Sequence, residues 1–316
     1  MVGFGISTGV ACAVVSIAGM FSPHHIPTEV TAGPVAPRVA IALSGAPAGT
    51  SVDAVLTFDI EAPWHIYYDG ENDSGQPPTI KGSGLPEGIK LGPIRWATPT
   101  RHLLDGGILD STYERRVELP FTFEIAASVL PGEHSGTLGV TWMECAEVCR
   151  VAEATLNWSL SVLPEGRKPE TTADAKVISA AVKTLPAVWT PELAAKLKDT
   201  LRISVEITPE TGRLKVWAGK ARGVEYHARA GSVRLIDAVE DGASETSSLD
   251  APLSIGEKER SDPKAAVTGI VVVVNEKGVR EGYEVNFPIT KKPDNKLQDK
   301  AKEIPRDSPE PKGGHK

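Results

Sequence analysis

The stretch Thr141-Trp-Met-Glu-Cys-Ala-Glu-Val-Cys-Arg-Val-Ala-Glu-Ala-Thr-Leu156 contains Cys145 and Cys149 and has apolar residues at alternate positions on both sides of them. A period of two is typical of half-buried strands. We therefore predict a hairpin whose two strands are joined by residues 146–148. The apolar residues in phase are Leu138, Val140, Trp142, Ala152, Ala154, Leu156, Trp158, Leu160 and Val162.

The register of this hairpin can be tested by parity. If Cys145 faces Cys149, then Trp142 faces Ala152, and every apolar residue in phase falls on one face, as a correct register requires. Directly opposed residues have Cβ atoms about 4.5–5.5 Å apart, which is close to the spacing within a disulfide. We expect the cysteine pair at the hairpin end, on the solvent side, within reach of another protein's sulfur.

Composition and the N-terminus predict an exported protein. The 316 residues carry a formal net charge of −7, which argues against a nucleic-acid partner. Residues 2–21 have no charged side chain, so residues 1–22 are predicted to be a cleaved export signal or a retained N-terminal membrane anchor. A periplasmic or otherwise extracytoplasmic location permits a disulfide.

Short alternating runs separated by turn residues predict a mostly-β chain with an immunoglobulin-like β-sandwich, followed by a second, smaller β-rich domain that one or two short helices precede. The tail is nearly free of apolar residues and is predicted to be disordered. The expected segments are 1–22 (signal or anchor), 23–36 (leader), 37–163 (sandwich), 164–172 (linker), 173–290 (second domain) and 291–316 (tail).

Within the second domain, helical spacing and alternation define the expected elements. The predicted helices cover 173–185 and 191–197, the predicted strands cover 201–207, 213–218, 232–239, 266–274 and 282–289, and residues 241–248 form a polar loop.

Residues 37–162 resemble the N-terminal periplasmic domain of DsbD-type thiol:disulfide interchange proteins. The Trp-x-x-Cys-x-x-x-Cys hairpin is the most specific part of the resemblance, and residues 266–289 are similar to the second extracytoplasmic domain of longer members. The other matching stretches are Trp64-His-Ile-Tyr67, Asp73-Ser-Gly75, Leu85-Pro86, Trp96 with Pro99 and Arg101, Tyr113-Glu114 and Leu119-Pro120.

The resemblance implies an immunoglobulin-like domain in which Cys145 and Cys149 act as a redox pair, without a cofactor. In that family the pair takes electrons from a membrane partner and passes them to thioredoxin-like proteins. These 316 residues contain no membrane-spanning electron-transfer segment and no thioredoxin Cys-x-x-Cys. We therefore expect a separate membrane electron donor and separate extracytoplasmic thioredoxin-like partners. The chain has Arg150-Val151 where the family often has proline.

The resemblance also implies a cap that shields the cysteines. The family's aromatic cap would fall near Leu104–Leu109, where Ile108 or Leu109 would supply an aliphatic one. Trp64, His65 and Tyr113 are further shielding candidates. The alternative for Trp64 and His65 is ordinary core packing with a hydrogen-bonded imidazole.

Three interpretations of the cysteine pair remain open at this stage. The first is thiol–disulfide interchange, and the second is a non-catalytic interaction module in which a structural disulfide staples the hairpin. The third is a Cu(I) site, because two thiolates and the thioether of Met143 are soft ligands on one face. Glu144 and Glu147 disfavour a thiolate and Arg150 favours it, so no strongly activated nucleophile is expected.

Overall fold

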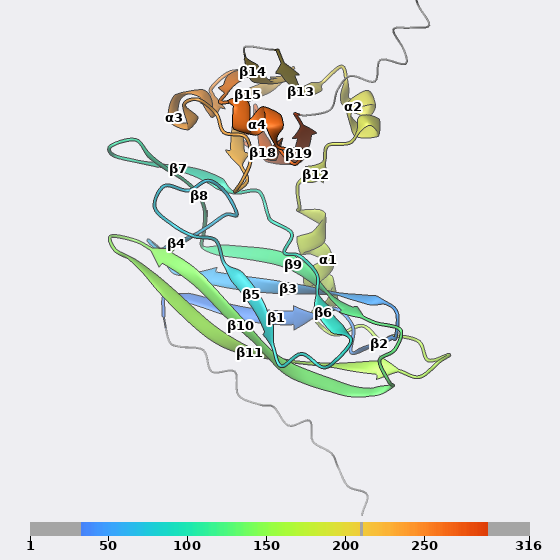
Figure 1. Cartoon of the computed structure of the whole chain (residues 1–316). Coiled ribbons are helices and arrows are strands. Elements are labelled where there is room, and N and C mark those ends of the chain that lie inside the picture. The colour runs from blue at the N-terminus through green and yellow to red at the C-terminus, as the bar shows by residue number, and fades with distance from the viewer. Residues whose placement is uncertain (1–32, 209–210, 290–316) are drawn as a thin grey trace, which may run out of the picture.

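The cysteine-bearing hairpin has the register that parity predicts. In the computed structural model, which describes residues 33–208 and 211–289, strand β10 (Gly132–Cys145) pairs antiparallel with β11 (Cys149–Leu163). Cys145 lies opposite Cys149, and Trp142 lies opposite Ala152. These are the longest strands described, and Figure 1 shows them as one twisted ribbon.

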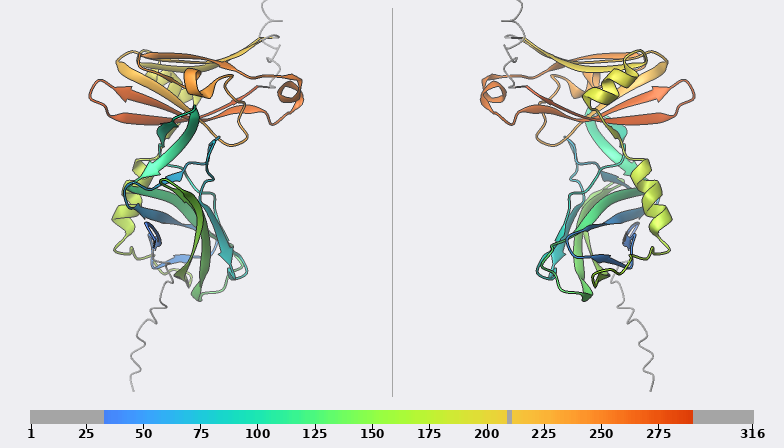
Figure 2. Two further views of the ribbon diagram at one scale, coloured as in Figure 1. Left: turned by 90° about the vertical axis from the view of Figure 1, so that its left-hand side faces the viewer. Right: turned by 90° about the vertical axis from the view of Figure 1, so that its right-hand side faces the viewer.

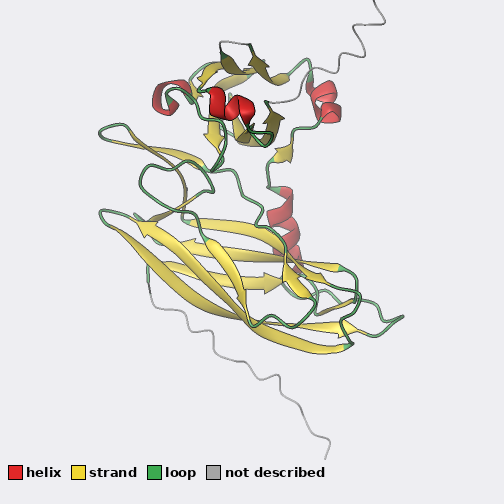
Figure 3. Ribbon diagram, in the orientation of Figure 1, coloured by secondary structure: helices red, strands yellow, loops and turns green. Residues whose placement is uncertain are grey.

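Two sheets form the sandwich around this hairpin, and Figure 3 shows the predominance of strands. One sheet contains β1 (Val35–Ile41), β3 (Ser51–Ile60), β9 (Arg116–Ile125) and β6 (Ile89–Leu91) in that order. The other contains β2 (Gly45–Pro47), β11, β10, β4 (His65–Tyr67), β8 (Ile108–Glu114) and β7 (Thr100–Leu104), with β5 (Thr79–Ser83) also on β10. This arrangement confirms the predicted immunoglobulin-like sandwich, although β1 begins two residues inside the expected leader.

The core of the sandwich lies between the two sheets. Residues in phase on β10 and β11 are buried against the in-phase residues of β3 and β9. Aromatic rings interlock there, since Phe58 meets Trp142 edge-on with ring centroids 5.6 Å apart. Phe123 likewise packs against Trp158 at 4.7 Å. Pairs of this kind contribute beyond the area that they bury.

Helix α1 (Ala175–Lys183) covers the outer face of the four-stranded sheet. Ile178 and Ala181 are buried against Val55, which points outward from β3. Figure 2 shows α1 along the side of the sandwich, between the two halves of the molecule. The expected linker comes shortly before this helix. The hydroxyl of Thr172, at the end of the linker, donates to the Ile41 carbonyl at 2.6 Å.

Two smaller sheets make up the second half of the chain. Helix α2 (Pro191–Leu197) lies between their first two strands in the sequence. The five-stranded sheet contains β12 (Ala187–Val188), β19 (Arg280–Pro288), β18 (Ala266–Asn275), β15 (Ala221–Ala228) and β16 (Ala243–Ser244). The three-stranded sheet contains β13 (Leu201–Ile207), β14 (Gly212–Ala218) and β17 (Ser248–Leu253). Two short helices, α3 (Ala238–Asp241) and α4 (Glu257–Ser261), complete this half.

The two halves share apolar packing. Val267 and Val271 of β18 belong to the core between the two smaller sheets. Ile270 and Val272, on the opposite face of the same strand, belong to the core of the sandwich. A strand buried on both faces has a continuous apolar sequence, which explains the run Ile270–Val274. The division into domains 37–163 and 173–290 remains a prediction.

One predicted strand is wrong. Residues 232–239 alternate as expected, and Val233 and Leu235 are buried, but the backbone forms only an isolated bridge from Leu235 to Leu253 before α3 begins. Strands β15 and β17 were not predicted. The expected signal or anchor and the tail, with all but the last four residues of the leader, lie outside the described residues. Within the described ranges no helix is long and apolar enough to cross a membrane.

Candidate functional site

A disulfide joins Cys145 and Cys149 at the end of the hairpin, with their Cα atoms 4.1 Å apart. The two sulfurs are not equally accessible. Cys149 is exposed as predicted, whereas Cys145 is only 1% exposed. The difference arises because β4 pairs with the last residues of β10 and places His65 directly opposite Cys145. A sulfur from another molecule can therefore approach Cys149 and not Cys145.

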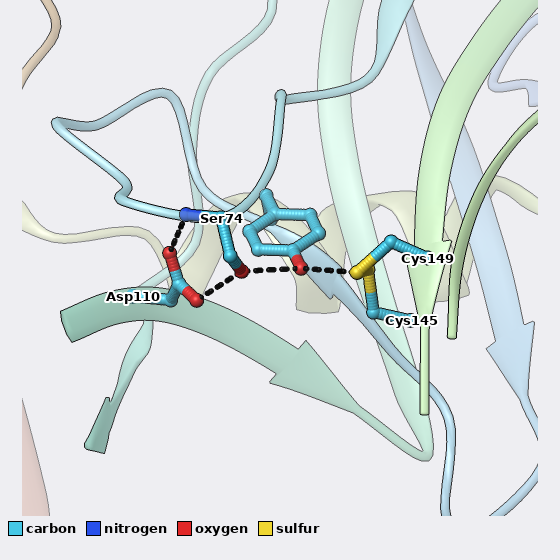
Figure 4. The surroundings of a disulfide bond; sticks show 5 residues. Ser74, Asp110, Cys145 and Cys149 are labelled. Atoms are coloured by element: carbon cyan, nitrogen blue, oxygen red, sulfur yellow. Dashed lines mark hydrogen bonds between the residues drawn. A yellow bond between two sulfur atoms is a disulfide. The ribbon is translucent and has the colours of Figure 1, made fainter. Parts of the chain in front are cut away.

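The hydroxyl of Tyr67 lies against the exposed cysteine. Its oxygen is 3.6 Å from Cys149 Sγ and 3.0 Å from Ser74 Oγ. Ser74 Oγ is in turn 2.5 Å from Asp110 Oδ2, and the Ser74 backbone N–H donates to Asp110 Oδ1 at 3.0 Å. Figure 4 shows this chain of polar atoms running from the carboxylate of Asp110 to the sulfur.

The carboxylate sets the direction of these hydrogen bonds. Because an ionised Asp110 can only accept, the Ser74 hydroxyl donates to it and its oxygen accepts from Tyr67. Burial raises the pKa of the Tyr67 phenol above its usual value, so the group keeps its proton at neutral pH. The hydroxyl that faces Cys149 is therefore a neutral donor, which is the form that can stabilise a thiolate.

Glycine at position 75 allows this close packing. A Cβ at Gly75 would collide with the ring of Tyr67. The loop that carries Ser74 can therefore lie directly over the ring only because position 75 lacks a side chain. This explains, in physical terms, the pattern Asp73-Ser-Gly75 that contributes to the family resemblance.

Glu144 stabilises the opposite face of the hairpin end. It is buried and accepts from Trp142 Nε1 at 2.8 Å and from Arg150 Nε at 2.6 Å. Because Arg150 is its partner residue on β11, this bond joins the two strands. The guanidinium of Arg150 also lies 4.9 Å from the centre of the Trp64 ring, within the range of a cation–π contact. Glu144 and Arg150 therefore neutralise each other on the face away from the sulfurs.

Two predicted shielding residues lie beside the hairpin. Trp64 is partly buried, packs against the core, and contacts Arg150 as described above. His65 is buried on the cysteine side, with its ring 4.9 Å from that of His102. Burial, assisted by the neighbouring His102, lowers the pKa of His65. Its buried Nε2 has no hydrogen-bond partner in the described part of the chain.

The other shielding candidates lie elsewhere on β8. Tyr113 faces the core, opposite Ile66, and its hydroxyl donates to the Ala97 carbonyl at 2.7 Å. Ile108 is at the exposed tip of the β7–β8 hairpin, and the backbone N–H of Leu109 donates to Asp73 Oδ2 at 2.7 Å. An aliphatic cap by Ile108 or Leu109 stays a prediction.

Sequence reasoning missed the roles of Tyr67, Ser74 and Asp110. The signal available was parity, since Tyr67 shares a strand face with His65, and both lie in stretches that carry the family resemblance. What the sequence could not supply is that β4 pairs with β10 and β8, which brings Tyr67 and Asp110 to the sulfurs.

Met143 is partly buried on the cysteine face, opposite Val151. With the disulfide formed, neither cysteine is available as a thiolate ligand. Residues 33–208 and 211–289 contain no group of three or more His, Cys, Asp or Glu side chains that could hold a metal ion. The Cu(I) interpretation would thus require the reduced pair.

Comparison with known proteins places the site in a family. Residues 31–157 match the family model described as thiol:disulfide interchange protein DsbD, N-terminal. A search of curated proteins gave no significant match. The fold is similar to that of the N-terminal periplasmic domain of ScsB from Proteus mirabilis, with a TM-score of 0.50 and 13% identity over 80% of this chain and 93% of that chain.

Weaker structural similarities were found to two other proteins. A family 123 glycoside hydrolase from Clostridium perfringens gives a TM-score of 0.24, with 13% identity over 41% of this chain and 27% of that chain. The periplasmic chaperone SfaE gives 0.21, with 13% identity over 78% and 97% of the two chains. Nothing is inferred from either similarity.

The family match covers the cysteine hairpin, β4, β8 and the loop that carries Ser74, which together make up the site described above. It associates the disulfide with thiol–disulfide interchange at the level of the family. Residues 31–157 of this chain therefore form a domain of the DsbD N-terminal family.

Proposed function

We propose that this protein is an extracytoplasmic thiol–disulfide interchange protein that relays electrons through the pair Cys145 and Cys149. The observation that carries the proposal is the asymmetry of the disulfide, with one exposed sulfur beside a neutral hydroxyl and one buried sulfur. Such a geometry gives a defined point of attack, which a purely structural staple does not need.

The exchange proceeds in two balanced steps. A thiolate of a reduced partner attacks Cys149 Sγ, a new intermolecular S–S bond forms, and the bond to Cys145 breaks with Cys145 leaving as a thiolate. The second thiolate of the partner then attacks its own sulfur in the mixed disulfide and releases Cys149. The pair gains two electrons and two protons and the partner dithiol is oxidised, and the reverse sequence passes the electrons on.

Tyr67 assists the release of Cys149. As negative charge develops on Cys149 Sγ, the Tyr67 hydroxyl rotates from Ser74 and donates to the sulfur. Ser74 stays bonded to Asp110, so the Tyr67 proton is the one that can turn toward the sulfur. The Tyr67 hydroxyl is thus suited to stabilising the leaving thiolate.

The partners proposed on this basis are thioredoxin-like extracytoplasmic proteins on one side and a separate membrane electron donor on the other. We place the redox site in a sandwich domain of residues 37–163 and a second domain at 173–290, joined by 164–172. The periplasmic location follows from the export signal expected in residues 1–22.

Trapping of a mixed disulfide tests which cysteine reacts. The full chain carrying Cys12→Ser and Cys145→Ser is activated at its one remaining thiol with Ellman's reagent and mixed with a reduced thioredoxin-fold protein that retains only its exposed active-site cysteine. The Cys12→Ser change is present in every variant of this experiment, because Cys12 is the third cysteine of the sequence. We expect a covalent complex through Cys149. The Cys149→Ser variant, treated alike, should form the complex at least about tenfold more slowly because the remaining thiol is buried. Equal rates, or faster reaction at Cys145, would contradict the proposal.

A reduction potential separates relay from staple. Thiol alkylation of the wild-type protein across a series of redox buffers gives the potential of the pair. A value above about −250 mV is that of a working dithiol, whereas one below about −300 mV is that of a structural disulfide. The second result would refute the relay and move the search for function to the second domain.

A further inference from the structure

The loop between β4 and β5 connects the redox site to the second domain. We call residues 69–75 of this loop the bridging loop. Its first part pairs with the turn after β15, through a bridge between Gly70 and Arg229 and through a bond from the Ala230 N–H to the Asp69 carbonyl at 3.2 Å. The Glu71 N–H also donates to the Ala228 carbonyl at 3.3 Å. The backbone of the bridging loop is therefore attached to the second domain.

The side chain of Glu71 strengthens this attachment. One of its oxygens accepts from the Gly231 N–H at 3.1 Å, and the other lies 2.6 Å from a guanidinium nitrogen of Arg234. Arg234 is mostly exposed, and Glu71 is about one-third exposed. The pair fixes the bridging loop against a turn that has no direct contact with the disulfide among the interactions described.

The second part of the bridging loop is attached to the redox site. Asn72 Oδ1 accepts from the Ser111 N–H at 2.8 Å, and the Asp73 N–H donates to the Leu109 carbonyl at 3.2 Å. The next residue, Ser74, makes the contacts with Asp110 and Tyr67 that face Cys149. Ser74 is three residues after Glu71 and bonds to the Tyr67 hydroxyl beside Cys149. A displacement of the loop at Glu71 would therefore change the surroundings of the sulfur.

Close backbone contact leaves little freedom at the junction. A Cβ at Gly70 would lie 2.8 Å from the carbonyl oxygen of Ala228 and equally close to the ring of Tyr68. The backbone of the bridging loop can thus approach the second domain only with glycine at this position. The contact can be disturbed there without changing any charge.

We propose that the second domain holds the bridging loop in place and thereby sets how open Cys149 is to attack, with Glu71 and Arg234 as positioning residues. The proposal deepens the proposed function, on which it rests for its biological meaning. It assigns a role to the second domain, whose described residues bond to the bridging loop and to β8. Release of the loop would withdraw Ser74 from the Tyr67 hydroxyl and leave Cys149 more exposed.

Charge reversal tests the proposal on the oxidised full-length protein. The rate at which dithiothreitol reduces the disulfide is measured for Glu71→Arg, for Arg234→Glu and for the double variant. Each single change should raise the rate by about two- to fivefold, the size that loss of one partly exposed ion pair allows. The double variant restores the ion pair with reversed polarity but not the bond from the Gly231 N–H, so its rate should fall from those of the single variants toward that of the wild type. Unchanged rates in both single variants would overturn the proposal.

A matched ion pair within the second domain provides the control. Arg213 Nε lies 2.6 Å from Asp250 Oδ1 between β14 and β17, away from the bridging loop. Arg213→Glu should lower stability by a similar amount and leave the reduction rate unchanged. An equal rate increase in this variant would show that any loss of stability exposes the disulfide, and would refute a positioning role for Glu71.

Gly70→Ala is the second, uncharged variant. Like Glu71→Arg, it should raise the rate at which dithiothreitol reduces the disulfide. A retained thermal unfolding transition shows that the variant is still folded. Because dithiothreitol needs no protein partner, these outcomes are independent of the trapping experiment. Failure to form a mixed disulfide would refute the relay. A reduction rate that is unchanged in Glu71→Arg, Arg234→Glu and Gly70→Ala would refute the positioning role alone.

Discussion

Two neighbouring sulfurs in one disulfide differ in role because of a single strand contact. β4 covers Cys145 and leaves Cys149 exposed, so the bond has a buried leaving group and an accessible point of attack. Arg150 is engaged by Glu144 on the face of the hairpin opposite the sulfurs. The neutral hydroxyl of Tyr67 is therefore the group best placed to respond to charge on Cys149.

Removal of that hydroxyl by Tyr67→Phe should make the reduced site less reactive. The thiolate of Cys149 loses a hydrogen-bond donor, so a higher pH is needed to form it. We expect the pH at which alkylation reaches half its maximal rate to move upward by about one unit, the size of one modest hydrogen bond to a charged group. The measurement is the pH profile of iodoacetamide alkylation of the reduced protein that carries Cys12→Ser and Cys145→Ser, in which Cys149 is the one remaining cysteine.

Tyr113→Phe is the matched control for this profile. It removes the hydrogen bond to the Ala97 carbonyl in the core and leaves the cysteine side unchanged. The expected result is a lower unfolding temperature with an unchanged alkylation midpoint. A midpoint that moves with Tyr113 and not with Tyr67 would assign the shielding role to Tyr113 instead.

At the scale of the elements, the hairpin end depends on a buried carboxylate. Glu144 is paired with Trp142 on its own strand and with Arg150 on the partner strand. Glu144→Ala leaves the buried Trp142 N–H without its acceptor and removes the cross-strand pair. We expect a loss of about 1–3 kcal/mol in the free energy of unfolding, measured by urea denaturation of the oxidised protein.

Glu147→Ala is the comparison, because Glu147 is an exposed residue in the three-residue loop between the same strands. Its effect should stay within about 0.5 kcal/mol. Similar losses in the two variants would mean that Glu144 acts only through the net charge of the hairpin end, and not through its buried hydrogen bonds.

The hairpin was also the element that sequence predicted best. Parity alone identified its register, because one face of the sandwich is apolar and a slip by one residue would expose Trp142 and Leu156. The helices over 173–185 and 191–197 were found from spacing, with α1 and α2 lying inside those ranges. The hairpin and α1 have one buried face and one solvent face, which is the condition under which periodicity is informative.

Strands with interrupted patterns escaped prediction. In β15, Glu225 and His227 point toward the sandwich, and their polar side chains bond to groups distant in sequence. In β17, Pro252 interrupts the strand pattern, and the structure places β17 at a sheet edge, where proline is tolerated. The redox site was predicted only as far as its cysteines, because Asp110 reaches it through strand pairing.

For the whole molecule, a largely buried polar network joins the second half of the chain to the sandwich. The hydroxyl of Ser111 on β8 lies 2.8 Å from His227 Nδ1, and His227 Nε2 lies 3.1 Å from Glu225 Oε2. Arg280 donates to both oxygens of Glu225 and to the Pro99 carbonyl of the first domain. Together with Ile270 and Val272 in the shared core, this network couples the two halves.

The network should make the stability of the protein fall as pH falls. Burial lowers the pKa of His227 from 6.5, although the adjacent Glu225 opposes the shift. Burial alone would raise the pKa of Glu225, but the hydrogen bonds from His227 and Arg280 bring it from 4.5 to about 2. The unfolded chain therefore binds more protons than the fold. The stability due to His227 is present above pH 6.5 and lost as pH falls through the lowered value.

His227→Gln isolates this contribution, because glutamine keeps hydrogen-bonding capacity and does not titrate. The unfolding temperatures of the wild type and the variant are compared at about pH 7.5 and about pH 5.5, on either side of the ordinary histidine value. The wild type should lose more stability between these pH values than the variant. His65, whose pKa is also lowered, is present in both proteins and cancels in the comparison. Equal losses would mean that His227 carries no part of the pH dependence.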